Sequence, residues 1–135
     1  VLGLISGRIQ LETLDGVLVD VQAEGPGDEV VDGGAVEAKA IRRLFKTRAD
    51  RILVNASKSL IGHTLGAAGA MGAIASSLAL ETGQVHPTAN YEHPDPACAL
   101  AGISRDTQER PLKVALLNAF GFGSNNAALV LKRFA

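Results

Sequence analysis

A lysine and a histidine lie five residues apart, directly before a segment made almost wholly of small residues. They are Lys58 and His63, in the stretch KSLIGHTLGAAGAMG. The small residues predict a helix from about residue 64 to residue 81, so both side chains belong to its amino-terminal end. The helix dipole disfavours a positive charge there and favours a neutral imidazole, which can donate one hydrogen bond. Taken alone, such a pair is more often a structural histidine beside a surface lysine.

A glycine-rich corner, GFGSNN, forms a second candidate site. Phe122 lies between Gly121 and Gly123, and Phe120 precedes them. Glycine tolerates the backbone conformations of a tight turn, so this segment predicts a flexible corner between two strands. Only 4% of the residues are aromatic, so two phenylalanines in one corner favour a binding role. Two core aromatics beside a β-turn remain the simpler alternative.

A single cysteine and two further histidines complete the residues that could do chemistry. Cys98 lies in the stretch PDPAC, and one thiol permits neither an internal disulfide nor a cysteine-based zinc cluster. Sparse cysteine fits a reducing, cytoplasmic setting. His86 and His93 lie in a proline-rich stretch whose spacing predicts no metal site. We expect these two histidines to be solvent-exposed or to support other residues of the site.

Four strands and two helices must position these residues. Runs of β-branched and apolar residues predict the strands, and an apolar period of 3.6 predicts the first helix. This order of elements is typical of a layered α/β or α+β domain. The strands are expected at 16–24, 51–57, 112–120 and 127–134, the helices at 35–46 and 64–81, and loops at 25–34 and 86–96.

The helix at 64–81 is unusual because it has no polar face. A helix of this kind is normally buried on all sides. Each interior glycine costs up to about 1 kcal/mol relative to alanine, and close approach of other backbone would explain that cost. We therefore expect the helix to lie between two sheets, packed more tightly than a chain of 135 residues could manage alone.

Composition limits the class of protein. The chain is 135 residues long, 47% hydrophobic and 20% charged, which suits one folded domain. Its net charge of -1, with both signs interspersed, argues against a nucleic-acid or membrane-surface partner. The segment 62–80 is interrupted by polar residues, and we expect it to be too polar to span a membrane. The amino-terminus has no charged leader and no initiator methionine, which predicts a chain trimmed or cut from something larger.

Three blocks together resemble the C-terminal part of a β-ketoacyl-acyl-carrier-protein synthase, a condensing enzyme of the thiolase fold. They are NASKSLIGHTLGAAG (55–69), VHPTANYEHPDPAC (85–98) and NAFGFGSNNAALVL (118–131). The resemblance extends back to VQAEGPGDEVVDGG, whereas residues 1–15 match weakly. It implies an α/β, thiolase-like fold in which residues 1–135 form most of the C-terminal half, with a mixed sheet packed on the Gly/Ala-rich helix.

The resemblance also implies roles for the candidate residues. His63 matches a catalytic histidine that donates a hydrogen bond to the malonyl thioester carbonyl and stabilises the enolate. Lys58 matches an active-site lysine with an electrostatic role. Phe122 matches a gating phenylalanine whose backbone N–H forms half of an oxyanion hole, and Phe120 matches a second pocket phenylalanine. Cys98 matches a non-catalytic position, and no cofactor or metal is implied.

Three departures from the family pattern accompany the match. The family's nucleophilic cysteine belongs to an N-terminal half that is absent from this chain, so we expect the chain alone to be inactive. Glu24 stands where the family has the first histidine of its catalytic pair, and a carboxylate there would repel a developing oxyanion. Gly72 stands where the family has a glutamate that pairs with the lysine. One hypothesis joins the two substitutions: Glu24 takes over as the partner of Lys58.

The reaction that the resemblance implies is acyl transfer and decarboxylative Claisen condensation of an acyl thioester with malonyl-carrier protein, in fatty-acid or polyketide synthesis. The implied partners are the N-terminal ketosynthase half or a partner subunit, and an acyl carrier protein with its thioester, within an oligomer. Two alternatives stay open. One is a non-catalytic subunit, like a chain-length factor, that pairs with an active ketosynthase. The other is a non-condensing acyltransferase or decarboxylase on the same fold.

Overall fold

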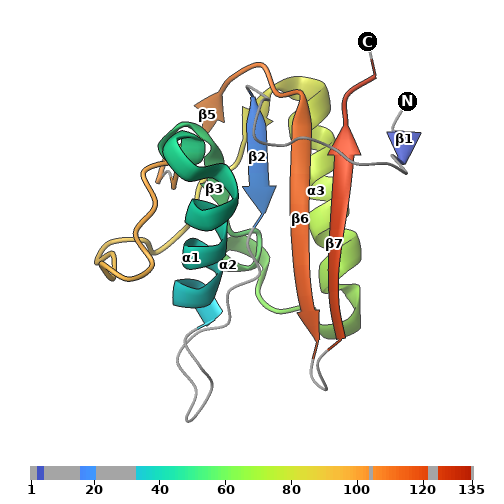
Figure 1. Cartoon of the computed structure of the whole chain (residues 1–135). Coiled ribbons are helices and arrows are strands. Elements are labelled where there is room, and N and C mark those ends of the chain that lie inside the picture. The colour runs from blue at the N-terminus through green and yellow to red at the C-terminus, as the bar shows by residue number, and fades with distance from the viewer. Residues whose placement is uncertain (1–2, 5–15, 21–32, 104, 122–124, 135) are drawn as a thin grey trace.

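A mixed five-stranded sheet organises the chain, with a helix on each face (Figure 1). The computed structural model describes residues 3–4, 16–20, 33–103, 105–121 and 125–134. The strand order is β1-β7-β6-β2-β3; β2 is parallel to β3 and β6, and β7 is antiparallel to β6 and β1. β4 and β5 form a separate antiparallel pair. The strands are β1 (Gly3–Leu4), β2 (Val17–Asp20), β3 (Leu53–Asn55), β4 (Gln84–Val85), β5 (Gln108–Glu109), β6 (Val114–Gly121) and β7 (Asn125–Lys132).

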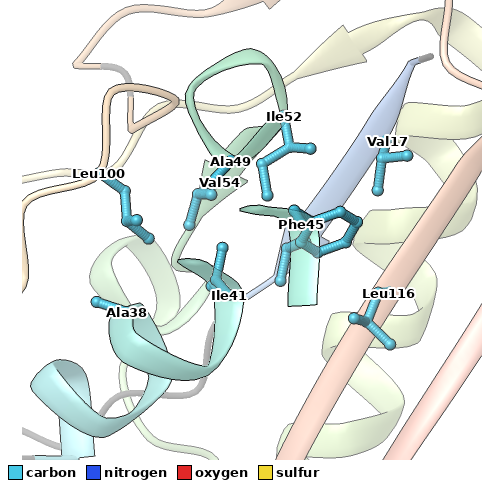
Figure 2. Close-up of a cluster of buried hydrophobic side chains, with 10 residues drawn as sticks. Val17, Ala38, Ile41, Phe45, Ala49, Ile52, Val54, Leu100 and Leu116 are labelled. Carbon is cyan, nitrogen blue, oxygen red and sulfur yellow. The ribbon is translucent and has the colours of Figure 1, made fainter. Parts of the chain in front are cut away.

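Helix α1 (Gly33–Phe45) covers one face of the sheet. Its buried stripe recurs every three to four residues, as an amphipathic helix requires. The stripe packs on alternate residues of the parallel strands, because successive strand side chains point to opposite faces. Figure 2 shows this cluster, in which Ala38, Ile41 and Phe45 of the helix gather with Val17, Val54 and Leu116 of the sheet and with Ala49, Ile52 and Leu100.

Helix α3 (Ala68–Thr82) covers the opposite face. The short helices α2 (Lys58–Ile61) and η3 (Leu65–Ala67) precede it, and it ends at Gly83, whose φ of 76° suits a left-handed cap. Its buried side chains pack on the strand residues that point away from α1. This second core contains Leu18, Leu53, Ala79, Leu80, Val85, Leu112, Ala115 and Leu131.

The prediction that the small-residue helix is buried on all sides is wrong for this chain. Only one face of α3 contacts the sheet, and that face contains Gly72, Ser76, Ala79 and Leu80. An added Cβ would meet nothing within 4 Å at Gly66 or Gly69, so close approach explains only Gly72. The exposed side of this region is strongly apolar, with Leu65, Met71, Ile74 and Leu78 between 39% and 74% exposed.

The expectation that this segment is too polar for a membrane was also too strong. Residues Leu65–Thr82 form an 18-residue helical window with a mean hydropathy of 1.2, which is long and apolar enough to cross a membrane by length and composition alone. Only 22% of that window is buried. A single helix of this kind is weak evidence for a membrane span, because core helices of soluble proteins have the same composition.

The predicted strands and helices are confirmed with shifted ends. The first strand is described only for Val17–Asp20, and residues 21–32, which include most of the predicted loop at 25–34, lie outside the described part of the chain. The stretch 86–96 has no helix or strand, as predicted. Helix α2, the 3-10 helix η2 (Lys46–Arg51) and the β4–β5 pair were not predicted, because elements this short carry no periodic signal.

Candidate functional site

Four of the described candidate residues follow or end strands at one edge of the sheet: Lys58, His63, Phe120 and Gly121. β2 and β3 are parallel, so their carboxyl ends meet, and Asp20 pairs in register with Asn55. Helix α2, which begins at Lys58, lies just beyond these ends (Figure 1). β6 is parallel to β2 and ends at the same edge, at Gly121. Crevices at the carboxyl ends of parallel strands are the usual ligand sites of open α/β sheets.

His63 lies between α2 and η3 and is exposed. The backbone N–H of Leu65 donates to its Nδ1 over 3.1 Å. Because Nδ1 accepts, the proton of the neutral ring resides on Nε2, which can then donate. Helix α3 begins at Ala68, farther from His63 than predicted. The local hydrogen bond from Leu65 thus selects the tautomer of the neutral ring.

Lys58 is half-buried and is the first residue of α2. The preceding residue, Ser57, is buried and attaches the start of α2 to β2. Asp20, the last residue of β2, feels the charge of Lys58. The structure thus places Lys58 at the start of α2 and His63 just after its end. The buried carboxyl group of Asp20 lies close enough to Lys58 to feel its charge.

Asp20 is only 1% exposed, and its carboxylate accepts two hydrogen bonds from Ser57. The Ser57 backbone N–H donates to Oδ1 over 3.1 Å, and the Ser57 hydroxyl donates to Oδ2 over 2.8 Å. Burial raises the pKa of Asp20 above its ordinary value of 3.8, because a charge is poorly solvated there. The two bonds from Ser57 and the charges of His86 and Lys58 oppose that rise.

His86 completes this buried cluster. Its Nε2 lies 3.0 Å from the Ser57 hydroxyl and 2.8 Å from Asn55 Nδ2, and its Nδ1 lies 2.9 Å from the Pro87 carbonyl. His86 is half-buried rather than solvent-exposed, and its contact with Ser57 agrees with the supporting role predicted for it, which stays a prediction. His93 is exposed, as the other alternative proposed.

Gly72 of α3 lies against the same carboxylate. A Cβ at this position would be 2.9 Å from Asp20 Oδ2 and 2.7 Å from Leu117 Cδ1. Both distances are shorter than real carbon contacts, so Asp20 and Leu117 fill the space that a side chain at position 72 would need. An acidic group is thus present beside position 72, supplied by Asp20 of β2 rather than by α3 itself.

The remaining predicted residues are described only in part. Phe120 is 48% exposed near the end of β6, where it pairs in register with Asn126. Gly121 is the last residue of β6. Glu24, Phe122 and Gly123 lie outside the described residues, so their roles, and the pairing of Glu24 with Lys58, stay predictions.

Sequence reasoning missed the cluster of Asp20, Ser57 and His86. One signal was present: Asp20 interrupts an otherwise apolar run in a strand expected to be buried, and a buried acid needs partners. Cys98 is half-buried. Among the residues that the structure describes, no three His, Cys, Asp or Glu side chains gather in a way that could hold a metal ion.

Comparison with known proteins identifies the family to which the chain belongs. The family model for the "Beta-ketoacyl synthase, C-terminal domain" matches residues 15–92, more than half of the chain. The 3-oxoacyl-[acyl-carrier-protein] synthase 2 of Coxiella burnetii is 37% identical over 113 residues, which are 84% of this chain and 27% of that protein. The chain thus spans about a quarter of this relative's length.

Two solved structures have the same fold. One is a type II PKS acyl-carrier protein in complex with its ketosynthase bound to the hexaketide (AntDE:AntF), with a TM-score of 0.76 and 30% identity over 89% of this chain and 28% of that one. The other is the ishigamide ketosynthase/chain length factor, with a TM-score of 0.75 and 30% identity over 94% of this chain and 29% of that one. The predicted thiolase-like fold is confirmed.

Proposed function

Because the chain belongs to the beta-ketoacyl synthase family, whose C-terminal domain it matches, we propose that it is the C-terminal portion or subunit of a decarboxylating condensing enzyme. The reaction joins an acyl thioester to malonyl-carrier protein in fatty-acid or polyketide synthesis. The names of the relatives support both settings. We further propose that the protein acts in the cytoplasm and meets an acyl carrier protein there.

The observation that carries the proposal is the hydrogen bond from the Leu65 backbone N–H to His63 Nδ1. Its Nδ1 accepts from the Leu65 backbone, so Nε2–H can donate to an oxygen that gains negative charge. In the proposed reaction the malonyl group loses carbon dioxide, and the electron pair of the broken C–C bond forms an enolate on the thioester carbonyl. Nε2–H stabilises that oxygen, and the positive charge of Lys58 adds to the field at the same edge.

The enolate carbon then attacks an acyl thioester. The new C–C bond forms as the carbonyl–sulfur bond breaks, and the sulfur leaves as a thiolate. We propose that this thiolate belongs to a cysteine of the N-terminal ketosynthase half or of a partner subunit, since Cys98 lies at a non-catalytic position. Phe122 and its backbone N–H are proposed to gate the acyl chain and to hold the second oxyanion.

The exposed side of α3 supports the same assembly. Leu65, Met71, Ile74 and Leu78 leave an apolar surface beside the candidate site. Soluble proteins rarely expose contiguous apolar patches of this kind unless a partner covers them. We propose that the N-terminal half of the enzyme, or a partner subunit, packs on this side of α3.

A second candidate function is a chain-length-factor-like subunit without activity of its own. Glu24 and Gly72 favour it, because both replace residues that the family uses for chemistry. One structural neighbour is itself named as a ketosynthase/chain length factor. The retained His63 and Lys58 favour the catalytic proposal instead. The third possibility, a non-condensing acyltransferase or decarboxylase, would use His63 with a different nucleophile.

Two variants distinguish between these three proposed functions. His63→Ala is made in the complete protein, with His93→Ala as the control, because His93 is exposed and lies in a loop away from any described contact of His63. Loss of one oxyanion donor is expected to lower kcat for condensation by about 100- to 1,000-fold. His93→Ala should leave kcat unchanged. Equal rates in both variants would favour the non-catalytic subunit, and malonyl decarboxylation without condensation would favour the third function.

A further inference from the structure

The hydrogen bonds around His86 restrict where the protons of this cluster can lie. Nδ1 faces a carbonyl oxygen, that of Pro87 at 2.9 Å, so Nδ1 must carry a proton. Nε2 faces the Ser57 hydroxyl, and the same hydroxyl faces Asp20 Oδ2 at 2.8 Å. Ser57 has one hydroxyl proton, so it can donate to Asp20 or to His86 but not to both.

Two complete arrangements satisfy this geometry. In the first, Asp20 is ionised and accepts the Ser57 proton, while Ser57 accepts a proton from Nε2 of a charged imidazole. In the second, Asp20 is protonated and donates to Ser57, which donates to Nε2 of a neutral imidazole. Asn55 Nδ2, at 2.8 Å from Nε2, can donate only to the unprotonated nitrogen and so matches the second arrangement.

The two arrangements differ only in where the protons lie. The proton on Nε2 moves to Ser57 Oγ as the Ser57 proton moves to Asp20 Oδ2. The number of protons and the net charge of the cluster do not change. Burial penalises the carboxylate of Asp20 and so opposes the charged arrangement, whereas the two hydrogen bonds that Ser57 donates to that carboxylate support it.

Among the residues that the structure describes, two charged groups act on Asp20: Lys58 from α2 and His86 from the segment after β4. β3 contributes the neutral amide of Asn55, and β6 contributes Leu117. From α3 the nearest position is Gly72, which has no side chain and whose space the carboxylate fills.

We propose that Asp20, Ser57 and His86 form a buried proton relay that positions the turn carrying Lys58. Ser57 directly precedes Lys58, and both its backbone N–H and its hydroxyl are fixed by Asp20. The relay therefore sets where α2 begins and how much carboxylate charge faces Lys58. These three are positioning residues that act through Lys58. The part of this inference that concerns catalysis rests on the proposed condensing function.

The test follows both ends of the relay by NMR in the complete protein that carries this chain. The carboxyl carbon of Asp20 and the ring nitrogens of His86 are labelled, and their signals are assigned by their loss in Asp20→Asn and His86→Gln. As pH falls, the cluster takes up one proton, which the two arrangements place on either Asp20 or His86, so in the wild type both signals are expected to change together over that pH range. Ser57→Ala removes the bridging hydroxyl and should separate the two transitions. Ser57→Thr keeps a hydroxyl and should restore the single transition.

The matched control is Ser77→Ala, because Ser77 also loses a hydroxyl bond, to the Ala73 carbonyl within α3, but has no described contact with the relay. It should leave both signals unchanged. Independent transitions of Asp20 and His86 in the wild type, or an unchanged single transition in Ser57→Ala, would overturn the relay.

A kinetic readout links the relay to Lys58. Ser57→Ala should lower kcat for condensation with little change in KM, and Ser57→Thr should recover it. Asp20→Asn mimics the protonated acid, because its amide can donate to Ser57, so the pH profile of kcat should lose the step caused by Asp20 ionisation. A wild-type-like profile in Asp20→Asn would contradict the positioning role. If the NMR coupling is present and no protein condenses substrate, the relay stands and the proposed function fails.

Discussion

Gly72 is the position where a single methyl group tests the packing at the candidate site. In a helix interior, replacing glycine with alanine normally stabilises the helix by up to about 1 kcal/mol. Here the added Cβ would meet Leu117 Cδ1 at 2.7 Å and Asp20 Oδ2 at 2.9 Å. Leu117 is 3% exposed, and Asp20 is held by Ser57, so neither atom can move away without cost.

The two effects oppose each other, and the clash is expected to dominate. Overpacking a buried site by one methyl group typically costs about 1–3 kcal/mol. Subtracting a helix gain of about 1 kcal/mol leaves Gly72→Ala destabilised by about 0–2 kcal/mol, with about 1 kcal/mol as the central value. The carboxylate also has to shift, so the bonds between Asp20 and Ser57 should weaken.

The assay is urea unfolding of the wild type, Gly72→Ala, Leu117→Val and the double variant. Leu117→Val removes the end of the side chain that Cβ would strike, so the cost of Gly72→Ala should shrink by about 1 kcal/mol in that background. A Gly72→Ala protein that is more stable than the wild type would refute the close packing of α3 on Asp20. So would a cost that is the same in both backgrounds.

Three further predictions concern charge, backbone and surface. The pKa of Asp20 is raised in the folded state, so the folded protein binds a proton more tightly than the unfolded chain does. The free energy of unfolding, measured relative to Asp20→Asn, should therefore be greatest below the ordinary pKa of 3.8 and fall as pH rises through the folded pKa. Urea titrations should show a fall of at most about 1.4 kcal/mol per pH unit. Gly83→Ala should lower stability by about 1–2 kcal/mol in the same assay, because φ is 76° and Cβ would lie 3.1 Å from the Arg110 carbonyl. Leu78→Lys should release the N-terminal half or partner from α3 in size-exclusion chromatography, whereas Val36→Lys, which is equally exposed on α1, should not.

Local patterns predicted the main elements because their signals are periodic. The apolar stripe of α1 and the apolar runs of β2 and β6 follow from side-chain spacing alone. Lys58 and His63 were expected at the amino-terminal end of the small-residue helix, and both precede α3, with Lys58 in α2 and His63 between α2 and η3. The start of α3 was misplaced, because η3 carries the same small residues without forming the α-helix.

Long-range contacts explain what the sequence could not predict. Asp20, Ser57 and His86 come from segments 29 or more residues apart, and no local pattern indicates that they meet. The burial of α3 was overestimated for a different reason. In the proposed assembly a partner covers further faces of α3, which would explain a composition without a polar face, whereas the described part of this chain buries only one face.

The most direct test of the central claim is intact mass spectrometry of the natively purified protein, before and after incubation with an acyl-carrier-protein thioester and then with malonyl-carrier protein. The condensing function predicts an acyl adduct on the N-terminal half or partner subunit, followed by its loss and a β-ketoacyl product on the carrier. His63→Ala should keep the adduct and lose the product. A wild-type protein that never gains an adduct, alone or with a co-purified partner, would contradict the claim that this chain completes a working condensing enzyme.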